Sequence, residues 1–176
     1  MVINLFGAPG CGKSTAAAGL FYELKKKDFS CELVTEYAKD LVYSGHLKES
    51  DQVDIFMEQY RRTKVAYEKV DFVITDSPLR ISEIYDNTKI PAFKPFVREI
   101  SRRFVNFNIL LQRKHAFKEE GRIHNEIEAK IIHEKIYTLI MGESITLDSL
   151  EVVDCLVRLF DMRRREGTDY ANYVQY

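Results

Sequence analysis

The stretch GAPGCGKST at residues 7–15 has the residue types and the spacing to bind a nucleoside triphosphate. It fits the pattern of Gly, four residues, then Gly-Lys-Ser. Glycines let the backbone N–H groups point inward, and a following helix adds the positive end of its dipole. In such a loop the lysine reaches the β- and γ-phosphates, and the serine hydroxyl holds Mg²⁺. The predicted phosphate-binding loop consists of Gly7, Ala8, Pro9, Gly10, Cys11, Gly12, Lys13, Ser14 and Thr15.

The residues on both sides of this motif predict the strand and the helix that such a loop needs. Residues 2–6, VINLF, form an apolar run that ends at a glycine, as expected of a buried parallel strand. Residues 14–27 place Ala17, Leu20, Phe21 and Leu24 on one helical face. Strand, loop and helix therefore follow one another in the required order.

Short apolar runs alternate with longer amphipathic segments along the rest of the chain. The candidate strands are 30–34, 71–76, 106–112 and 145–148, and the candidate helices are 51–70, 123–141 and 150–161. Such alternation predicts an α/β fold in which helices cover both faces of a parallel sheet. Ligands of such sheets bind at the carboxyl ends of the strands, so the residues just after each strand are the first candidates for chemistry.

Composition favours one cytoplasmic domain. The chain has 176 residues, 45% of them apolar, and a net charge of −1, which argues against a surface that binds nucleic acid throughout. Its three cysteines are far apart and suggest neither a disulfide framework nor a zinc site. We see no signal-type segment and no apolar run of membrane-spanning length, so we expect no membrane partner. The oligomeric state is left open.

Acidic residues follow two of the predicted strands. Asp76 ends the strand at 71–76 and has the position of the carboxylate that assists Mg²⁺ beside a phosphate loop, although it can also cap a helix. Glu36 follows the strand at 30–34, where a carboxylate can accept the proton of an incoming hydroxyl or bind the acceptor. The alternative for Glu36 is an exposed charge at a helix start. Either Glu36 or Asp76 can be the general base.

The charged segment 113–126, RKHAFKEEGRIHNE, predicts a lid between the fourth strand and a long helix. Phosphoryl transfer needs water kept out and negative charge neutralised, and a closing segment that carries arginine does both. Arg113 and Arg122 are the candidate nucleotide-binding arginines, with Arg122 also in a catalytic role. The alternative is a solvated charged loop.

Four segments together resemble a family of small P-loop kinases: the phosphate loop, ELVTEYAKDLV at 32–42, VITDSPL at 73–79 and QRKHAFKEEGRIHNEIEAK at 112–130. The family includes the ribosylnicotinamide-kinase domain of NadR-type proteins and compact kinase-like proteins of bacteriophages. The resemblance implies a three-layer P-loop kinase fold with a five-stranded parallel sheet, a lid, and ATP and Mg²⁺ as cofactors. It implies a kinase domain at 1–162, followed by a basic, tyrosine-rich tail at 163–176. It also implies that Ser14 and Asp76 serve the metal.

The acceptor of the phosphate is the open question. A looser similarity to deoxynucleoside kinases implies that Gln59 reads the acceptor base, and we expect Glu36, Tyr37 and Arg80 to bind the acceptor with it. The family admits a nucleoside, a nucleotide, or a hydroxymethylated pyrimidine within DNA. Basic residues near Phe93, Phe96 and Phe104 and in the tail are compatible with DNA, but the phenylalanines also have helix-core spacing.

The sequence thus predicts a P-loop kinase that transfers phosphate from ATP to a hydroxyl of a nucleoside- or nucleotide-type acceptor. One alternative is a kinase of modified DNA, located in the host cytoplasm if a phage encodes it. The other is a P-loop ATPase or switch that transfers phosphate only to water.

Overall fold

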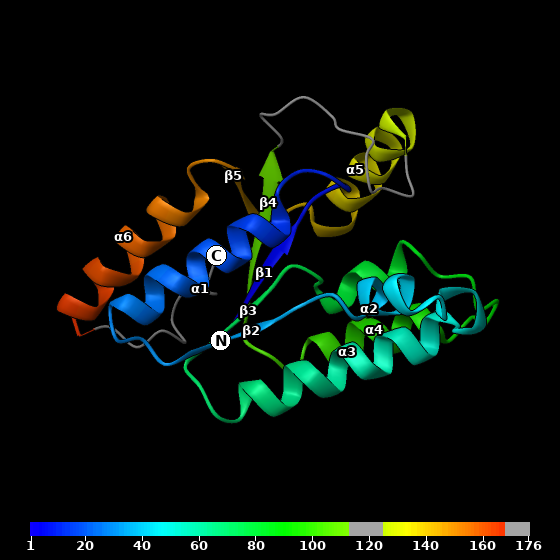
Figure 1. The fold of residues 1–176 in the computed structure, drawn as a ribbon, viewed down its shortest axis with the longest axis horizontal. Helices are drawn as coiled ribbons and strands as arrows, with labels where there is room; N and C mark the ends of the chain where they lie inside the picture. Colours follow the sequence, from blue (N-terminus) through cyan, green and yellow to red (C-terminus); the bar gives the residue numbers. More distant parts are fainter. Residues whose placement is uncertain (113–124, 168–176) are drawn as a thin grey trace.

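The computed structural model describes residues 1–112 and 125–167. Its centre is a five-stranded sheet in the order β2-β3-β1-β4-β5 (Figure 1). All neighbouring strands are parallel, as predicted. The strands are β1 (Val2–Phe6), β2 (Cys31–Val34), β3 (Phe72–Thr75), β4 (Asn106–Gln112) and β5 (Ser144–Asp148).

Six α-helices and two 3₁₀ helices connect the strands in the described ranges. They are α1 (Lys13–Lys26), α2 (Tyr37–Ser44), η1 (Leu47–Glu49), α3 (Gln52–Tyr67), η2 (Leu79–Glu83), α4 (Phe93–Ser101), α5 (Glu126–Ile140) and α6 (Val152–Arg165). Helix α6 continues to Arg165, so the expected tail begins inside a helix. Residues 168–176 lie outside the described ranges. No helix within those ranges is long and apolar enough to cross a membrane.

The helices form a layer on each face of the sheet, because side chains alternate along every strand. In β1, Ile3 and Leu5 belong to the core beneath α1 and α6. Val2 belongs to the core beneath α3 and α4, and Phe6 to the core beneath α5. Figure 1 shows α1 and α6 on one side of the sheet and α3, α4 and α5 on the other. This is the three-layer α/β arrangement that the sequence predicts.

The parallel strands bring the predicted site residues to one edge of the sheet. The phosphate loop follows β1, Glu36 comes soon after β2, and Asp76 directly follows β3. Residues 113–124 of the expected lid, including Arg113 and Arg122, lie outside the described residues. Of the lid, the structure describes only Asn125, which caps α5, and Glu126, the first residue of that helix.

Candidate functional site

The loop between β1 and α1 depends on two glycines. A Cβ on Gly7 would overlap Cys11 Sγ and lie 3.3 Å from the Leu111 carbonyl oxygen, so only glycine lets the loop close here. Gly12 precedes α1 with φ of +89°, a left-handed conformation that glycine adopts without strain. The curled backbone that the motif predicts is therefore present, and Cys11 is buried inside it.

The N-terminus of α1 is the natural place for an anion. No side chain caps this helix, and its first turn contains no acidic residue. By contrast, Asp51 caps α3 through the N–H groups of Val53 and Asp54, and Asn125 caps α5 in a capping box. The first N–H groups of a helix need partners, and a phosphate can supply them. The residues present therefore fit a nucleotide's phosphates.

Lys13 lies over the curve of this loop. Its ammonium group donates to the carbonyl oxygens of Gly7, at 2.8 Å, and Ala8, at 3.2 Å. These contacts hold the positive charge where a phosphate chain along the loop would meet it. Ser14 follows directly and is exposed at the start of α1, as a metal-binding hydroxyl needs to be.

Asp76 is a buried carboxylate with an open oxygen. Its residue is 4% exposed, and no described residue donates a hydrogen bond to Oδ1. A buried charge without a partner is costly, so such an oxygen indicates a missing cation or donor. Mg²⁺ uses one or two protein oxygens and completes its shell with phosphate oxygens and water. No group of three His, Cys, Asp or Glu side chains suited to a metal occurs among the described residues, so Asp76 and Ser14 fit this sparse type of site.

Glu36 is half-buried and interacts electrostatically with both Lys13 and Asp76. Burial raises the pKa of its carboxyl group, the Lys13 ammonium opposes that rise, and the Asp76 carboxylate adds to it. The fold has thus brought together the three residues that the sequence placed at separate strand ends. A carboxylate with a raised pKa is a stronger base than a solvent-exposed one.

Gln59 makes backbone contacts that the sequence did not predict. It is buried on α3, where Oε1 accepts the N–H of Tyr37 at 3.0 Å and Nε2 donates to the Thr35 carbonyl oxygen at 3.3 Å. Both ends of the amide thus hold the backbone on either side of Glu36. Gln59 therefore supports the backbone on both sides of the predicted base, and its expected role toward the acceptor base stays a prediction.

Arg80 likewise makes contacts that the sequence did not predict. Its guanidinium donates to Glu83 at 3.0 Å, to Glu143 at 2.7 Å and to the Leu139 carbonyl oxygen at 3.0 Å. These contacts join η2 to the C-terminal end of α5 and the loop before β5. Arg80 therefore links these elements, and its expected role in acceptor binding stays a prediction.

Tyr37 begins α2, and the Arg62 guanidinium lies 4.8 Å from its ring centre. Its ring is only partly buried, so it is still a candidate for acceptor binding.

Two residues near the site escaped the sequence analysis. Tyr85 follows η2, and burial together with the nearby Glu36 carboxylate raises the pKa of its hydroxyl to about 12. Ser149 follows β5, and its Cβ lies 3.7 Å from where a Cβ on Gly12 would be. Ser149 Oγ is buried and has no hydrogen-bond partner in the described part of the chain. Neither residue belongs to a motif. Ser149, however, follows the end of a predicted strand, and this position could have marked it as a candidate site residue.

The aromatic residues considered for DNA stacking are mostly in the core. Phe93 and Phe104 are 4% and 8% exposed, whereas Phe96 is exposed. Core packing is thus the correct interpretation for both residues, although Phe104 lies beyond the end of α4 at Ser101. Arg98, one of the basic residues beside them, donates to Glu83 at 2.7 Å.

Comparison with known protein families shows to which family the chain belongs. The model of the AAA domain family matches residues 2–151, which include the phosphate loop, Glu36 and Asp76. The chain belongs to the AAA domain family. This AAA domain is of the P-loop NTPase type, so its nucleotide-binding character follows from the family as well as from the loop. No curated protein matches the chain significantly.

A solved structure similar to this AAA domain is the crystal structure of the NadR protein in complex with NAD and AMP-PNP. The TM-score is 0.60 and the identity 14%, over 95% of this chain and 49% of that chain. At this identity the likeness shows the shared fold alone. The chain spans about half the length of the NadR chain.

Proposed function

We propose that this chain is an ATP-dependent phosphotransferase that moves the γ-phosphate to a hydroxyl of a nucleoside- or nucleotide-type acceptor. The observation that carries the proposal is the position of Glu36. This half-buried carboxylate lies within electrostatic reach of Lys13 and Asp76, and Gln59 holds the backbone around it. The NadR structure, which contains AMP-PNP, supports nucleotide binding by this fold.

Each residue of the site has a task in this reaction. ATP with Mg²⁺, when bound, supplies the phosphoryl group and part of the charge neutralisation. The loop N–H groups and Lys13 hold the phosphates, while Ser14 Oγ and Asp76 hold the metal. Glu36 accepts the proton of the acceptor hydroxyl as that oxygen forms its bond to phosphorus and the bond to ADP breaks.

Glu36 is a better candidate for the base than Asp76 on two grounds. Its pKa is raised, which strengthens it as a base, and it lies at the start of α2, beside the partly buried ring of Tyr37. Asp76 directly follows a strand buried at every position, where a carboxylate can serve a metal beside the loop. The roles of Arg113 and Arg122 in neutralising charge rest on the sequence alone.

The test is the transfer of label from γ-³²P-ATP, with Mg²⁺, to parallel pools of nucleosides, nucleoside monophosphates, nicotinamide riboside, and DNA with and without hydroxymethylated pyrimidines. We expect label on a small molecule. Label on modified DNA would support the other acceptor, and release of phosphate alone would support the ATPase.

The same assay on Lys13→Ala tests the phosphate loop. We expect transfer to fall by about 10³-fold, because a charge aimed at the transferred phosphate is lost. Lys26→Ala is the matched control, since Lys26 lies at the other end of α1 and pairs with Glu23. Transfer at the wild-type rate by Lys13→Ala would refute the assignment of this loop.

A further inference from the structure

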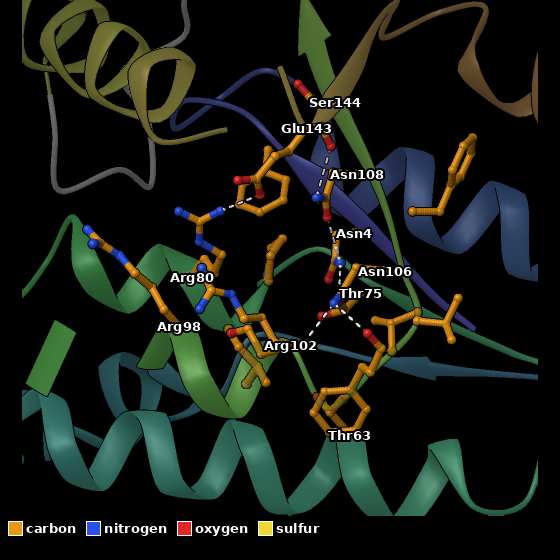
Figure 2. A pocket seen from close by; sticks show the side chains of 18 of the residues that line it. Asn4, Thr63, Thr75, Arg80, Arg98, Arg102, Asn106, Asn108, Glu143 and Ser144 are labelled. Carbon is orange, nitrogen blue, oxygen red and sulfur yellow. Dashed lines mark hydrogen bonds and ion pairs between the residues drawn. The ribbon is translucent and has the colours of Figure 1, made fainter. Parts of the chain in front are cut away.

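A cavity of about 590 Å³ lies on the sheet face that carries α3, α4 and α5. Residues of η2, of α4 and of the loop before β5 surround it, and Figure 2 shows their side chains around the sheet. Asn106 and Ser144, the first residues of β4 and β5, belong to its lining, whereas the phosphate loop lies beyond the opposite ends of the strands. The volume is typical of a small-molecule site.

The floor of this cavity is polar where a buried sheet is expected to be apolar. Thr75, Asn4, Asn108 and Ser144 are register partners on the neighbouring strands β3, β1, β4 and β5. Asn4 and Thr75 are 5% and 1% exposed. Strands of a parallel sheet covered on both faces are usually continuous apolar runs, so packing does not explain a polar row across four of them.

Hydrogen bonds fix the direction of the amides in this row. Asn106 Nδ2 donates to the carbonyl oxygens of Ser101 and Phe104, so its Oδ1 must be the acceptor toward Asn4. Asn4 Nδ2 then donates to both Asn106 and Asn108, each at 2.9 Å. Asn108 extends this series of hydrogen bonds, because its Nδ2 donates to the Glu143 carbonyl oxygen at 3.1 Å (Figure 2).

These hydrogen bonds leave one acceptor on Asn4 and one donor on Asn108, which are register partners on β1 and β4. Within the described ranges nothing donates to Asn4 Oδ1, since both hydrogen bonds of Asn4 use Nδ2. Asn108 Nδ2 has two hydrogens and gives one to Glu143. An acceptor next to a donor on neighbouring strands is complementary to an N–H group beside a C=O group, as in a pyrimidine lactam.

The rim of the cavity carries an excess positive charge. Arg80 and Arg98 both pair with the buried Glu83, and Arg80 also pairs with Glu143. Arg102 lines the cavity as well, is exposed, and forms no ion pair with another described residue. Three arginines against two glutamates leave one positive charge, which Arg102 supplies.

We propose that this cavity is a second ligand site, for a small anion whose planar N–H/C=O edge pairs with Asn4 and Asn108 while its carboxylate or phosphate group binds Arg102. Apolar residues, among them Pro78 and Leu79, form part of the wall against which a ring can pack. The proposal does not depend on the proposed phosphotransfer, because neither Lys13 nor Glu36 lines the cavity. The cavity shares two strands with the catalytic edge, because β1 leads into the phosphate loop and β3 leads to Asp76.

The test is isothermal titration calorimetry with three probes in the absence of ATP. Orotate supplies the edge with a carboxylate, uridine 5′-monophosphate supplies it with a phosphate, and uridine is the neutral control. We expect at least one anion to bind with a dissociation constant below about 1 mM, and uridine to bind at least about tenfold more weakly. Which anion binds identifies the carboxylate or the phosphate as the preferred group.

Two variants with opposite expected effects on the affinity for the anion make the test specific. Arg102→Ala should weaken binding of the anion by about tenfold, because a charged hydrogen bond is lost. Glu143→Gln should tighten it by about two- to fivefold, because the side chain is 62% exposed and only screened repulsion is removed. Arg103→Ala is the matched control, since Arg103 is an exposed neighbour that does not line the cavity.

Three outcomes would overturn the proposal. The first is that neither anion binds the wild-type protein. The second is equal binding by the wild type and Arg102→Ala. The third is loss of binding in Lys13→Ala, because that would place the probe at the phosphate loop. Retained binding in Lys13→Ala excludes the phosphate loop as the site of the probe, and loss of binding in Arg102→Ala locates the probe in this cavity.

Discussion

Asp76 and Glu83 are equally buried carboxylates in the segment that follows β3, yet their surroundings differ. Each residue is 4% exposed. Glu83 accepts from Arg80 at 3.0 Å and from Arg98 at 2.7 Å, so its charge is matched within the fold. Asp76 Oδ1 has no partner among the described residues. A buried charge is tolerated when it is paired, so Glu83 fits a structural role, whereas the unpartnered oxygen of Asp76 fits the metal-binding role that we propose.

Asp76→Asn should give the largest effect on function. We expect turnover with Mg²⁺ to fall by about 10³-fold, because the neutral amide binds the metal poorly. Stability without ligand should stay the same or rise, since an unpaired buried charge is removed. Phosphotransfer rates and urea unfolding of the same preparations measure both. Turnover near the wild-type rate would mean that Asp76 is as structural as Glu83.

Glu83→Gln should show the reverse pattern. Arg80 and Arg98 lose a charged partner inside the fold, and we expect the free energy of unfolding to fall by about 3 kcal/mol. Turnover per folded molecule should change little, because Glu83 pairs within η2 and α4 and not with the phosphate loop. The same two measurements apply, and a loss of turnover at full stability would contradict the structural role.

The strands, the phosphate loop and the acidic residues after β2 and β3 could be predicted because their signals are local. An apolar run, a glycine spacing and an acidic residue after a strand each lie within a few positions. Gln59 and Arg80 could not be assigned, because their partners are distant in sequence. Gln59 binds Tyr37 across 22 positions, and Arg80 binds Glu143 across 63.

The sequence contains a signal for the cavity, but it can be recognised only once the register of the strands is known. Asn4, Asn106 and Asn108 interrupt apolar strands, and each alone is compatible with a strand end or a sheet edge. They become one feature only when β1 pairs with β4 and places Asn4 beside Asn108. Register depends on the whole sheet and cannot be read from one strand.

Gln59→Ala tests whether the Gln59 side chain positions the proposed base, Glu36. Both hydrogen bonds to the backbone around Glu36 are lost, and we expect kcat to fall by about tenfold because the carboxylate is less well positioned. Gln52→Ala is the matched control on the same helix, since Gln52 is also buried but donates to Ser82. Equal losses of kcat in the two variants would indicate a general effect of packing.

Glu36→Gln should have a smaller, pH-dependent effect on stability. Because the folded pKa of Glu36 is raised above its ordinary value of 4.5, the folded state disfavours the ionised form. The stability that the protonated group contributes is complete below the ordinary pKa and is lost as pH rises through the raised one. Glu36→Gln should therefore unfold at a higher temperature than the wild type at pH 7. The two proteins should converge at acidic pH, and thermal unfolding across pH measures this.

The most direct test of the central claim is the fate of the γ-phosphate in a single turnover. Enzyme in excess over γ-³²P-ATP, with Mg²⁺ and the acceptor pool that shows label, is quenched over time, and label on the acceptor is compared with free phosphate. We predict that most label reaches the acceptor and that Asp76→Asn and Lys13→Ala lose this transfer while Glu83→Gln keeps it. Label found only as free phosphate, at a rate that no acceptor changes, would contradict it.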